Sequence, residues 1–294
     1  MVGGKTIQTY EHGRPRLMQH ETVHADLHAH TCYSDGTLPP AVLVERAAER
    51  GVQVLAITDH DTTDGLENAW EAAQEWEIRL VPGVELSVEA KDRPVHVLGY
   101  GFDPTHTAIE DHLSAFTQQR QARFNRMVQC LSDSGVQIAS HVVDRHVEQS
   151  SAPGRPHLAR ALMDEGHVDS YQAAFDEYLG RDRPAYVPAP ACPAGEAIEA
   201  LHAAGGVAVV AHPGQWMPGS VLRFLRDQGL DGIECMAPSH PDYLVDYYQN
   251  ICRSYSLLIT GGSDYHGNPD AEEMDLGTVG LTPAQWERFR AAIA

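Results

Sequence analysis

The chain has 294 residues, enough for about two domains or for one large α/β barrel. Its composition, 43% hydrophobic and 21% charged, excludes wholesale disorder, a collagen-like repeat and a disulfide scaffold. A formal net charge of −20 argues against a protein that coats long nucleic acid through a broad basic surface, since such binding needs many lysines and arginines. Histidine, with 17 residues, is the unusual component, because imidazole both titrates near neutral pH and binds metal ions.

The first residues of the chain carry no pattern of a folded element. Residues 1–21 are polar and without periodicity, so we expect an N-terminal tail there. No apolar run is long enough to cross a membrane, and the N-terminus lacks the features of a secretory signal. The five cysteines are scattered and form no Cys-x-x-Cys pair, which fits reduced thiols. We therefore expect a cytoplasmic protein.

From residue 23 onward, short runs of valine, isoleucine and leucine alternate with amphipathic stretches, which is typical of an α/β fold. Strands are predicted at residues 23–27, 52–58, 78–84, 94–99, 207–211, 232–235 and 257–261, with a further short one near 278–281. Helices are predicted at residues 39–50, 64–76, 194–204, 220–228 and 283–293.

The alternation breaks in the middle of the chain. Helical stretches follow one another there, at residues 106–134, 156–165 and 170–179. The segment 183–193 is rich in proline, which blocks the hydrogen bonds of a sheet, so we expect an extended connector. The sequence therefore predicts a barrel built from residues 22–103 and 192–294, with a helical insertion at 104–191 that forms a lid for the substrate.

Carboxylates and imidazoles recur where the predicted strands end. They are His28 and His30 after the first strand, Asp35 in the following turn, His60 after the second, Glu85 after the third, His96 on the fourth, His212 after the fifth, and Asp264 and His266 after the seventh. Since the carboxyl ends of parallel strands meet at one mouth, we expect these side chains to converge. A single histidine is more often a hydrogen-bonded core residue, but nine ligand-type residues at six strand ends are hard to explain by chance. Imidazole with carboxylate suits manganese, iron and zinc, and nine ligands are too many for one tetrahedral ion, so two or three divalent ions are predicted.

The combined pattern is similar to a known family. It comprises His28-x-His30, Asp35, Thr58-Asp-His-Asp61, Glu85, His96, His212 and Asp264-x-His266, and it resembles the PHP superfamily, named for polymerase and histidinol phosphatase. The resemblance implies a distorted (β/α)7 TIM-like barrel with a trinuclear metal centre, usually of Mn²⁺, with iron and zinc as alternatives. It also implies the distribution of the ligands: His28, His30 and Asp264 for one ion, Glu85 bridging to a second held by His96 and His212, and Asp35, His60 and His266 for the third.

Arginines are scarce in this acidic chain, so their clustering is informative. Arg120, Arg123 and Arg126 lie three apart on a predicted helix, and Arg155 precedes the next helix. The simpler interpretation, preferred for Arg126, is a solvated helix face, and the alternative is a clamp for phosphate. The arrangement resembles one PHP branch, the 3′,5′-nucleoside bisphosphate phosphatases, whose relatives also trim RNA from its 5′ end. That resemblance implies that Arg120, Arg123 and Arg155 grip substrate phosphate.

We expect a hydrolase that removes the 3′-phosphate of nucleoside 3′,5′-bisphosphates, such as pAp to AMP. No covalent protein nucleophile is needed, because a hydroxide that bridges two metal ions can attack the phosphorus. Asp35 and His60 are expected to face the substrate in addition to the arginines. The substrate is expected to be a small phosphorylated nucleotide or short RNA, with no stable protein partner.

Alternatives to this function stay open at this point. The same centre could remove nucleotides stepwise from the 5′ end of short 5′-phosphorylated RNA, or hydrolyse histidinol phosphate without using Arg120 and Arg123. An amidohydrolase would leave the arginines unexplained. A non-enzymatic, metal-stabilised binding module usually lacks some ligands, whereas all nine positions are filled here. His157 could assist catalysis or form a helix-start hydrogen bond, and His240 could assist catalysis or lie on a loop surface.

Overall fold

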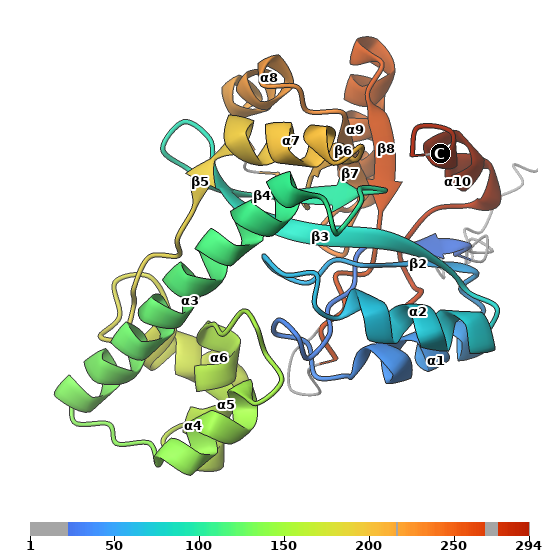
Figure 1. Cartoon of the computed structure of the whole chain (residues 1–294). Helices are drawn as coiled ribbons and strands as arrows, with labels where there is room; N and C mark the ends of the chain where they lie inside the picture. The colour runs from blue at the N-terminus through green and yellow to red at the C-terminus, as the bar shows by residue number, and fades with distance from the viewer. Residues whose placement is uncertain (1–22, 216, 268–275, 294) are drawn as a thin grey trace, which may run out of the picture.

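The computed structural model describes residues 23–215, 217–267 and 276–293, so the tail predicted at residues 1–21 lies outside the described residues. Strands form the wall of a nearly closed barrel in the order β1-β2-β3-β4-β6-β7-β8 (Figure 1). They are β1 (Ala25–Asp26), β2 (Val54–Ile57), β3 (Arg79–Glu89), β4 (Pro94–Tyr100), β6 (Val207–Val210), β7 (Gly232–Met236) and β8 (Leu258–Gly261), while the short β5 (Cys192–Pro193) pairs with β3 outside this order. The Leu27 N–H donates to the carbonyl oxygen of Gly261 at 3.2 Å, so the first and last strands meet. The predicted (β/α)7 barrel is confirmed.

The direction of β4 departs from the all-parallel arrangement that the sequence led us to expect. β3 and β4 pair antiparallel, and β4 pairs antiparallel with β6 as well. The reason is the short connection: Lys91 and Asp92 form a tight turn with left-handed backbone angles, and so short a turn joins only antiparallel strands. β3 also extends further than predicted, so Glu85 lies within the strand and not after it. The late strand predicted at residues 278–281 is wrong, because this segment forms a single antiparallel bridge to β1.

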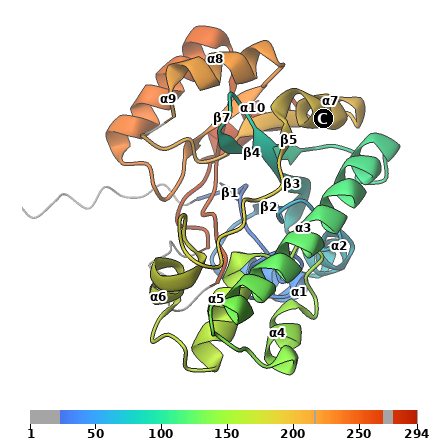
Figure 2. The same cartoon turned by 90° about the vertical axis from the view of Figure 1, so that its left-hand side faces the viewer.

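Helices cover the outside of the barrel (Figures 1 and 2). They are α1 (Pro40–Glu49), α2 (Leu66–Glu75), α7 (Ala194–Ala203), α8 (Gly219–Asp227), α9 (Asp242–Tyr255) and α10 (Pro283–Arg290). Proline in the first turn starts α1 and α10, as the sequence predicts. α9 is not among the helices predicted from the sequence, although the buried Leu244, Tyr248 and Cys252 of α9 recur every four residues, which is the spacing of a helix face.

A packed apolar cluster joins the barrel strands to α10. Leu98 and Tyr100 of β4 pack there with Trp286 and Phe289, and the Tyr100 hydroxyl donates to the carbonyl oxygen of Leu27 at 2.8 Å. Close packing of this kind holds the strands in fixed relative positions. Polar side chains that follow the strands are therefore held on a rigid base.

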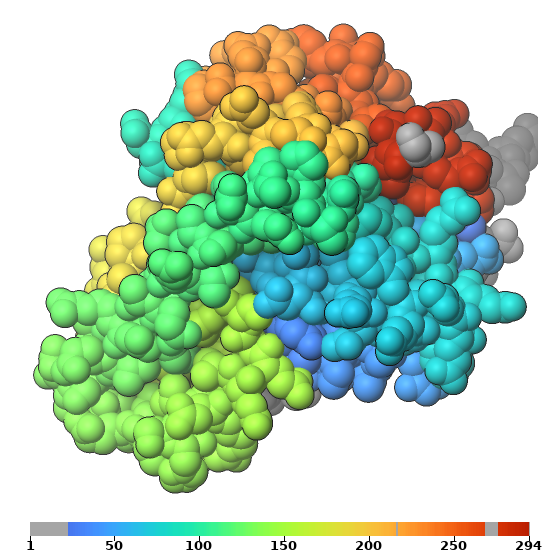
Figure 3. All heavy atoms as spheres, in the orientation of Figure 1, coloured from blue at the N-terminus to red at the C-terminus, as the bar shows by residue number. Residues whose placement is uncertain are grey.

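The helical insertion forms a lobe beside the barrel (Figure 3). It contains α3 (Thr107–Asp133), α4 (Ser140–Val147), α5 (Arg155–Asp164) and α6 (Tyr171–Ala174), which continues as one π-helical turn, η1 (Phe175–Leu179). The lobe has an apolar core of its own, to which Phe124, Met127 and Leu158 contribute, whereas Leu113 near the start of α3 belongs to the core of the barrel. α3 thus connects the two regions. The sequence predicts these helices except α4. Within the described ranges, no helix is both long and apolar enough to cross a bilayer.

Candidate metal centre

The structure brings all nine predicted ligands to one mouth of the barrel. They come from the segments after β1, β2, β6 and β8 and from within β3 and β4. His96 reaches the mouth from the first half of β4, which is possible because this strand runs against its neighbours. The side chains of His28, His30 and Glu85 are fully buried, whereas those of His96 and His212 are 35% and 30% exposed. The two exposed imidazoles therefore mark the open side of the group.

A first set of close contacts joins His28, His30, Glu85 and Asp264. The Nε2 atoms of the two imidazoles lie 3.1 Å apart, and each lies 3.2 Å from Glu85 Oε2. Asp264 Oδ1 lies 3.2 Å from His28 Nε2 and 3.3 Å from His30 Nε2. These four atoms are close enough to bind the same ion.

A second set of contacts surrounds the other side of Glu85. Its Oε1 atom lies 2.8 Å from His96 Nδ1 and 3.0 Å from His212 Nε2. Its Oε2 atom, which belongs to the first set, also lies 3.2 Å from His60 Nδ1. Glu85 therefore stands between two sets of potential ligands, as a bridging carboxylate would.

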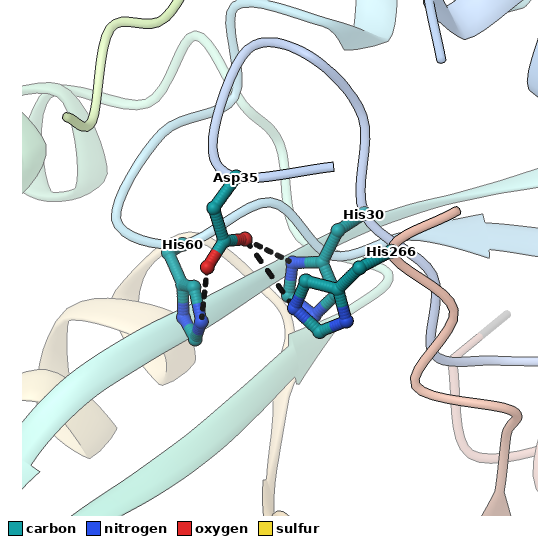
Figure 4. A group of neighbouring side chains, drawn as sticks. All are labelled: His30, Asp35, His60 and His266. Atoms are coloured by element: carbon teal, nitrogen blue, oxygen red, sulfur yellow. Dashed lines mark ion pairs between the residues drawn. The ribbon is translucent and has the colours of Figure 1, made fainter. Parts of the chain in front are cut away.

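A third set of contacts centres on Asp35, as Figure 4 shows. Asp35 Oδ1 lies 3.3 Å from His266 Nε2 and 3.8 Å from His30 Nδ1, and its Oδ2 atom lies 3.8 Å from His60 Nε2. The imidazoles of His30 and His266 are stacked, with ring centroids 4.1 Å apart. Through His30 and His60, this set is continuous with the other two.

The chemistry of the donor atoms suits metal ions. The buried Nδ1 atoms of His60 and His96 have no hydrogen-bond partner within the described chain, although Glu85 oxygens lie nearby, and such unpaired polar atoms are costly. His28 Nδ1 lies 2.9 Å from Glu234 Oε1, and when Nδ1 donates this hydrogen bond, Nε2 carries a lone pair. That lone pair then faces carboxylate oxygens, which are also acceptors. A divalent cation among these atoms would bind the unpaired nitrogen atoms and would also separate the lone pair of His28 from the carboxylate oxygens.

The electrostatics of the mouth favour positive charge. Burial lowers the pKa of His212, but its hydrogen bond to Glu85 and the charges of Glu85 and Asp264 raise it to about 9. Burial also opposes the charged form of His266, yet the charge of Asp35 and its hydrogen bond raise the pKa to about 10. Burial tends to raise the pKa of the Glu85 carboxyl, but the surrounding imidazoles hold it well below its usual range. Such a site attracts cations.

Comparison with known proteins agrees with the geometry. A family model described as the PHP domain matches residues 26–182. The chain belongs to the PHP family. The 5′-3′ exoribonuclease Rnm of Salmonella typhimurium is 34% identical over 252 residues, which cover 82% of this chain and 84% of that protein. The 3′,5′-nucleoside bisphosphate phosphatase of Chromobacterium violaceum is 34% identical over 277 residues, which cover 91% of this chain and 97% of the relative.

A solved structure extends the likeness to the fold. A protein from Bifidobacterium adolescentis, assigned as a metal-dependent phosphoesterase, superposes with a TM-score of 0.83 at 33% sequence identity. The match covers 91% of this chain and 96% of that chain. This PHP protein is therefore a metal-dependent phosphoester hydrolase.

Glu234 supports the PHP centre from β7 and is not among the site residues predicted from the sequence. Its Oε1 atom accepts the hydrogen bond of His28 Nδ1, and its Oε2 atom accepts one from the backbone N–H of His212 at 2.6 Å. A carboxylate behind a metal-binding histidine fixes the ring and its tautomer. Glu234 is fully buried in an otherwise apolar strand, and that isolated charge was the signal that could have identified it.

Asp59 fixes the loop that carries Asp35 in this PHP protein. It accepts hydrogen bonds from the backbone N–H of Thr31 at 2.7 Å, from the Thr31 hydroxyl at 2.6 Å and from the Ser34 hydroxyl at 2.5 Å. The turn after His30 is thus tied to the end of β2. Asp35 is thereby held in place, because Thr31 and Ser34, which precede it in the chain, are bound to Asp59.

The helical insertion and the metal mouth share one cleft, with a volume of about 1200 Å³. Its lining includes His96 and His212 of the mouth and Arg123 and Arg155 of the insertion. Two of the three arginines predicted to hold phosphate therefore open into the same space as two predicted metal ligands. Arg120 is not among the described residues that line this cleft.

Arg123 and Arg155 are held by uncharged groups. Arg123 Nε donates to the carbonyl oxygen of Val187 at 2.9 Å. The guanidinium of Arg155 lies over the rings of Phe175 and Tyr186, 5.6 and 5.9 Å from their centroids. Among the described residues neither arginine has a carboxylate partner, so both can bind an anion.

Arg120 and Arg126 have different surroundings. Arg120 is buried and binds Asp61 and Ser87 of the barrel. Arg126 is exposed on α3, in keeping with the solvated helix face preferred for it.

His157 and His240, whose roles the sequence leaves open, are placed by hydrogen bonds to the backbone. His157 Nδ1 accepts from the N–H of Gly154 at 3.1 Å, which is the helix-start alternative. His240 is buried, so the alternative of a loop-surface position is wrong. Its Nε2 atom accepts from the N–H of Gly214 and its Nδ1 atom donates to the carbonyl oxygen of Cys235, both at 2.9 Å, which links two loops next to the mouth.

Proposed function

We propose that this PHP protein hydrolyses the 3′-phosphate of nucleoside 3′,5′-bisphosphates, converting pAp to AMP. The observation that carries the proposal is the shared cleft, which is lined by His96 and His212 and by Arg123 and Arg155. A bisphosphate places two anionic groups on one small molecule. One group can lie at the metal mouth while the other lies at the arginines. A substrate with a single phosphate would leave one of these two places unused.

We assign the predicted ligands to two or three divalent ions, with Mn²⁺ as the proposed metal and iron or zinc as alternatives. Three groups would hold them: His28, His30 and Asp264 with Glu85; Glu85 with His96 and His212; and Asp35, His60 and His266. When bound, such ions neutralise phosphate oxygens and lower the pKa of water enough to supply a hydroxide nucleophile near neutral pH. No serine or cysteine nucleophile of the chain is then required.

The insertion, residues 104–191, would act as a lid that supplies the cations for the second phosphate. Burial, together with the nearby charges of Arg155 and Arg120, lowers the pKa of Arg123 to about 10, so the guanidinium stays charged at neutral pH. Guanidiniums this close repel one another, and an anionic phosphate among them relieves the repulsion. Asp35 and His60 would face the phosphate that lies at the metal mouth.

The test compares phosphate release from adenosine 3′,5′-bisphosphate, adenosine 3′-monophosphate and histidinol phosphate by the Mn²⁺-loaded protein. We expect the bisphosphate to be preferred by about 100-fold or more in kcat/KM, because each charge-assisted hydrogen bond contributes ~1.5–3 kcal/mol. Arg123→Gln should reduce this preference, and Arg126→Gln, on the exposed face of the same helix, should leave it unchanged. Equal turnover of the three compounds would contradict the proposal.

A second function, stepwise removal of nucleotides from the 5′ end of short 5′-phosphorylated RNA, is favoured by the size of the cleft. Its volume of about 1200 Å³ exceeds the ~300–1,000 Å³ typical of sites for one small molecule. The lining also includes Lys91, Arg93 and Arg181, which could contact the phosphates of further nucleotides.

Chain-length dependence tests this second function. Arg93→Ala should slow the turnover of a 5′-phosphorylated tetranucleotide more than that of the bisphosphate. Arg183→Ala is the matched control, because Arg183 is exposed and is not among the described residues lining the cleft. An equal effect of Arg93→Ala on both substrates would count against RNA as a substrate.

A further inference from the structure

Arg120 reaches from the insertion into the barrel and forms an ion pair there. Its side chain projects from α3 and is 9% exposed. Its Nε and Nη2 atoms both donate to Asp61 Oδ2, at 2.6 and 2.5 Å, and Nη2 also donates to the Ser87 hydroxyl at 3.1 Å. Arg123, one turn further along the same helix, lines the cleft and binds a backbone carbonyl instead. Two adjacent arginines of α3 thus face different targets.

Asp61 connects the segments that carry two predicted metal ligands. It directly follows His60, and its backbone N–H donates to the carbonyl oxygen of Glu85 at 2.9 Å. Its carboxylate accepts hydrogen bonds from the Ser87 N–H at 2.7 Å and from the Ser87 hydroxyl at 2.8 Å. His60 and Glu85 also form a parallel bridge at this point. The position of Asp61 therefore fixes the spacing of His60 and Glu85.

The charge of Arg120 is needed to keep Asp61 in this position. Asp61 is 1% exposed, and its buried carboxylate accepts hydrogen bonds from the guanidinium of Arg120. Without Arg120, the carboxylate would be buried with no cation bound to it. An unpaired buried carboxylate is costly, so it would move toward water, and that movement alters its hydrogen bonds to Ser87.

We propose that Arg120, Asp61 and Ser87 form a positioning unit that ties the helical insertion to the metal mouth, and that Arg120 acts on the metal centre through Asp61 without contacting substrate. The proposal concerns the same site as the proposed function and rests on its being metal-dependent. It departs from the family-based expectation that Arg120, like Arg123, grips phosphate. Two arginines of α3, three residues apart, then have different roles. Arg120 holds the metal ligands in position, and Arg123 binds the anionic phosphate.

The test is a comparison of Arg120→Gln with Arg123→Gln in the full-length protein. Mn²⁺ binding is measured by electron paramagnetic resonance titration without any nucleotide, and kcat and KM are measured for the bisphosphate at saturating Mn²⁺. Arg120→Gln should weaken Mn²⁺ binding by roughly 10- to 100-fold, as expected for partners of metal ligands, with KM within about twofold of the wild type. Arg123→Gln should give the reverse: unchanged Mn²⁺ binding and a raised KM.

Two results would overturn the inference. One is a raised KM in Arg120→Gln with wild-type Mn²⁺ binding, which would make Arg120 a substrate ligand. The other is wild-type Mn²⁺ binding with unchanged KM, which would leave Arg120 without a role in the site. Metal binding is measured without nucleotide, so the Mn²⁺ affinities stay valid even if the proposed substrate is wrong. A failure of the positioning role can therefore be told apart from a failure of the proposed function.

A second pair of variants covers the case in which Arg120→Gln does not fold. Ser87→Ala removes the hydroxyl that Asp61 and Arg120 share and keeps the ion pair, so we expect a smaller loss of Mn²⁺ affinity, about two- to fivefold, with unchanged KM. Arg120→Lys keeps a cation and should therefore bind Mn²⁺ more tightly than Arg120→Gln. If Arg120→Gln does not fold, the Mn²⁺ affinity of Arg120→Lys is compared with the wild type, to which it should be close. Wild-type Mn²⁺ binding in Ser87→Ala combined with a raised KM in Arg120→Lys would contradict the positioning role.

Discussion

The barrel mouth and the helical insertion arrange their charges in opposite ways. At the mouth, titratable groups are packed against one another, and the Glu85 carboxylate alone lies within 3.2 Å of five imidazoles. In the insertion, Arg123 and Arg155 are held by a carbonyl oxygen and by aromatic rings, and within the described part of the chain neither has a carboxylate partner. The mouth is therefore organised for cations and the insertion for anions. In the proposed function, a phosphorylated nucleotide with its metal ions would join the two.

The largest effect is expected from removing the charge at the centre of the mouth. Glu85→Gln should abolish binding of at least one metal ion and lower phosphate release by about 1,000-fold or more, because Glu85 contacts ligands of two groups. Metal content by mass spectrometry and phosphate release measure the two effects. Glu71→Gln, on the exposed face of α2, is the control. A variant that retained all metal and full turnover would mean that the mouth is not the catalytic centre.

A substitution that creates a cavity in the core of the insertion should lower the stability of the protein without changing metal binding at the mouth. Leu158 is fully buried in the cluster that unites the insertion helices, and Leu158→Ala should reduce the free energy of unfolding by about 2–5 kcal/mol. Chemical denaturation measures this loss, with the exposed Gln118→Ala as control. Mn²⁺ affinity should stay within about twofold of the wild type. A parallel fall in Mn²⁺ affinity would show that the two regions cannot be separated as we describe.

A smaller effect is expected behind the mouth. Glu234→Gln should weaken Mn²⁺ binding by roughly 10- to 100-fold, since an uncharged amide orients the His28 ring less strongly than a carboxylate does. Titration of the apoprotein with Mn²⁺ measures the change, and Glu199→Gln on the surface of α7 is the control. Unchanged affinity would place Glu234 among purely structural residues.

The smallest effect concerns acid sensitivity of the insertion. Burial lowers the pKa of His157 to about 4, against about 6.5 in an unfolded chain, so the unfolded state binds more protons between these values. The free energy of unfolding should therefore fall as the pH drops below 6.5, by about 1.4 kcal/mol at pH 5.5, because a protonated His157 Nδ1 cannot accept from Gly154. His157→Gln, which does not titrate, should lack this contribution. The same acid dependence in the variant would rule out His157 as its source.

The sequence was most informative where function depends on strand ends. His28, His30, His60 and His212 follow buried apolar runs, and the rule that such ends converge was sufficient to place them together. His96 was also predicted to lie at the mouth, but the rule for parallel strands does not explain its position. β4 runs antiparallel to β3, so the first half of β4 lies at the mouth. The two-residue turn between β3 and β4 was the overlooked signal.

Partners that are distant in the chain were not predictable by the same reasoning. Arg120 and Asp61 are 59 residues apart, and no periodicity of either segment indicates that they pair. Glu234 likewise contacts His28 across 206 residues. Local patterns predict which face of an element is buried, whereas a pair such as Arg120 and Asp61 depends on how α3 runs from the barrel into the insertion (Figure 1). Which phosphate the arginines would hold also depends on this path.

The most direct test of the central claim is to identify the products formed from adenosine 3′,5′-bisphosphate by the Mn²⁺-loaded protein. If the 5′-phosphate lies at Arg123 and Arg155 while the 3′-phosphate lies at the metal mouth, the products are AMP and inorganic phosphate. A chelator should abolish the reaction until Mn²⁺ is restored. Release of the 5′-phosphate to give adenosine 3′-monophosphate, or an intact bisphosphate after incubation with the metal-loaded protein, would contradict the account.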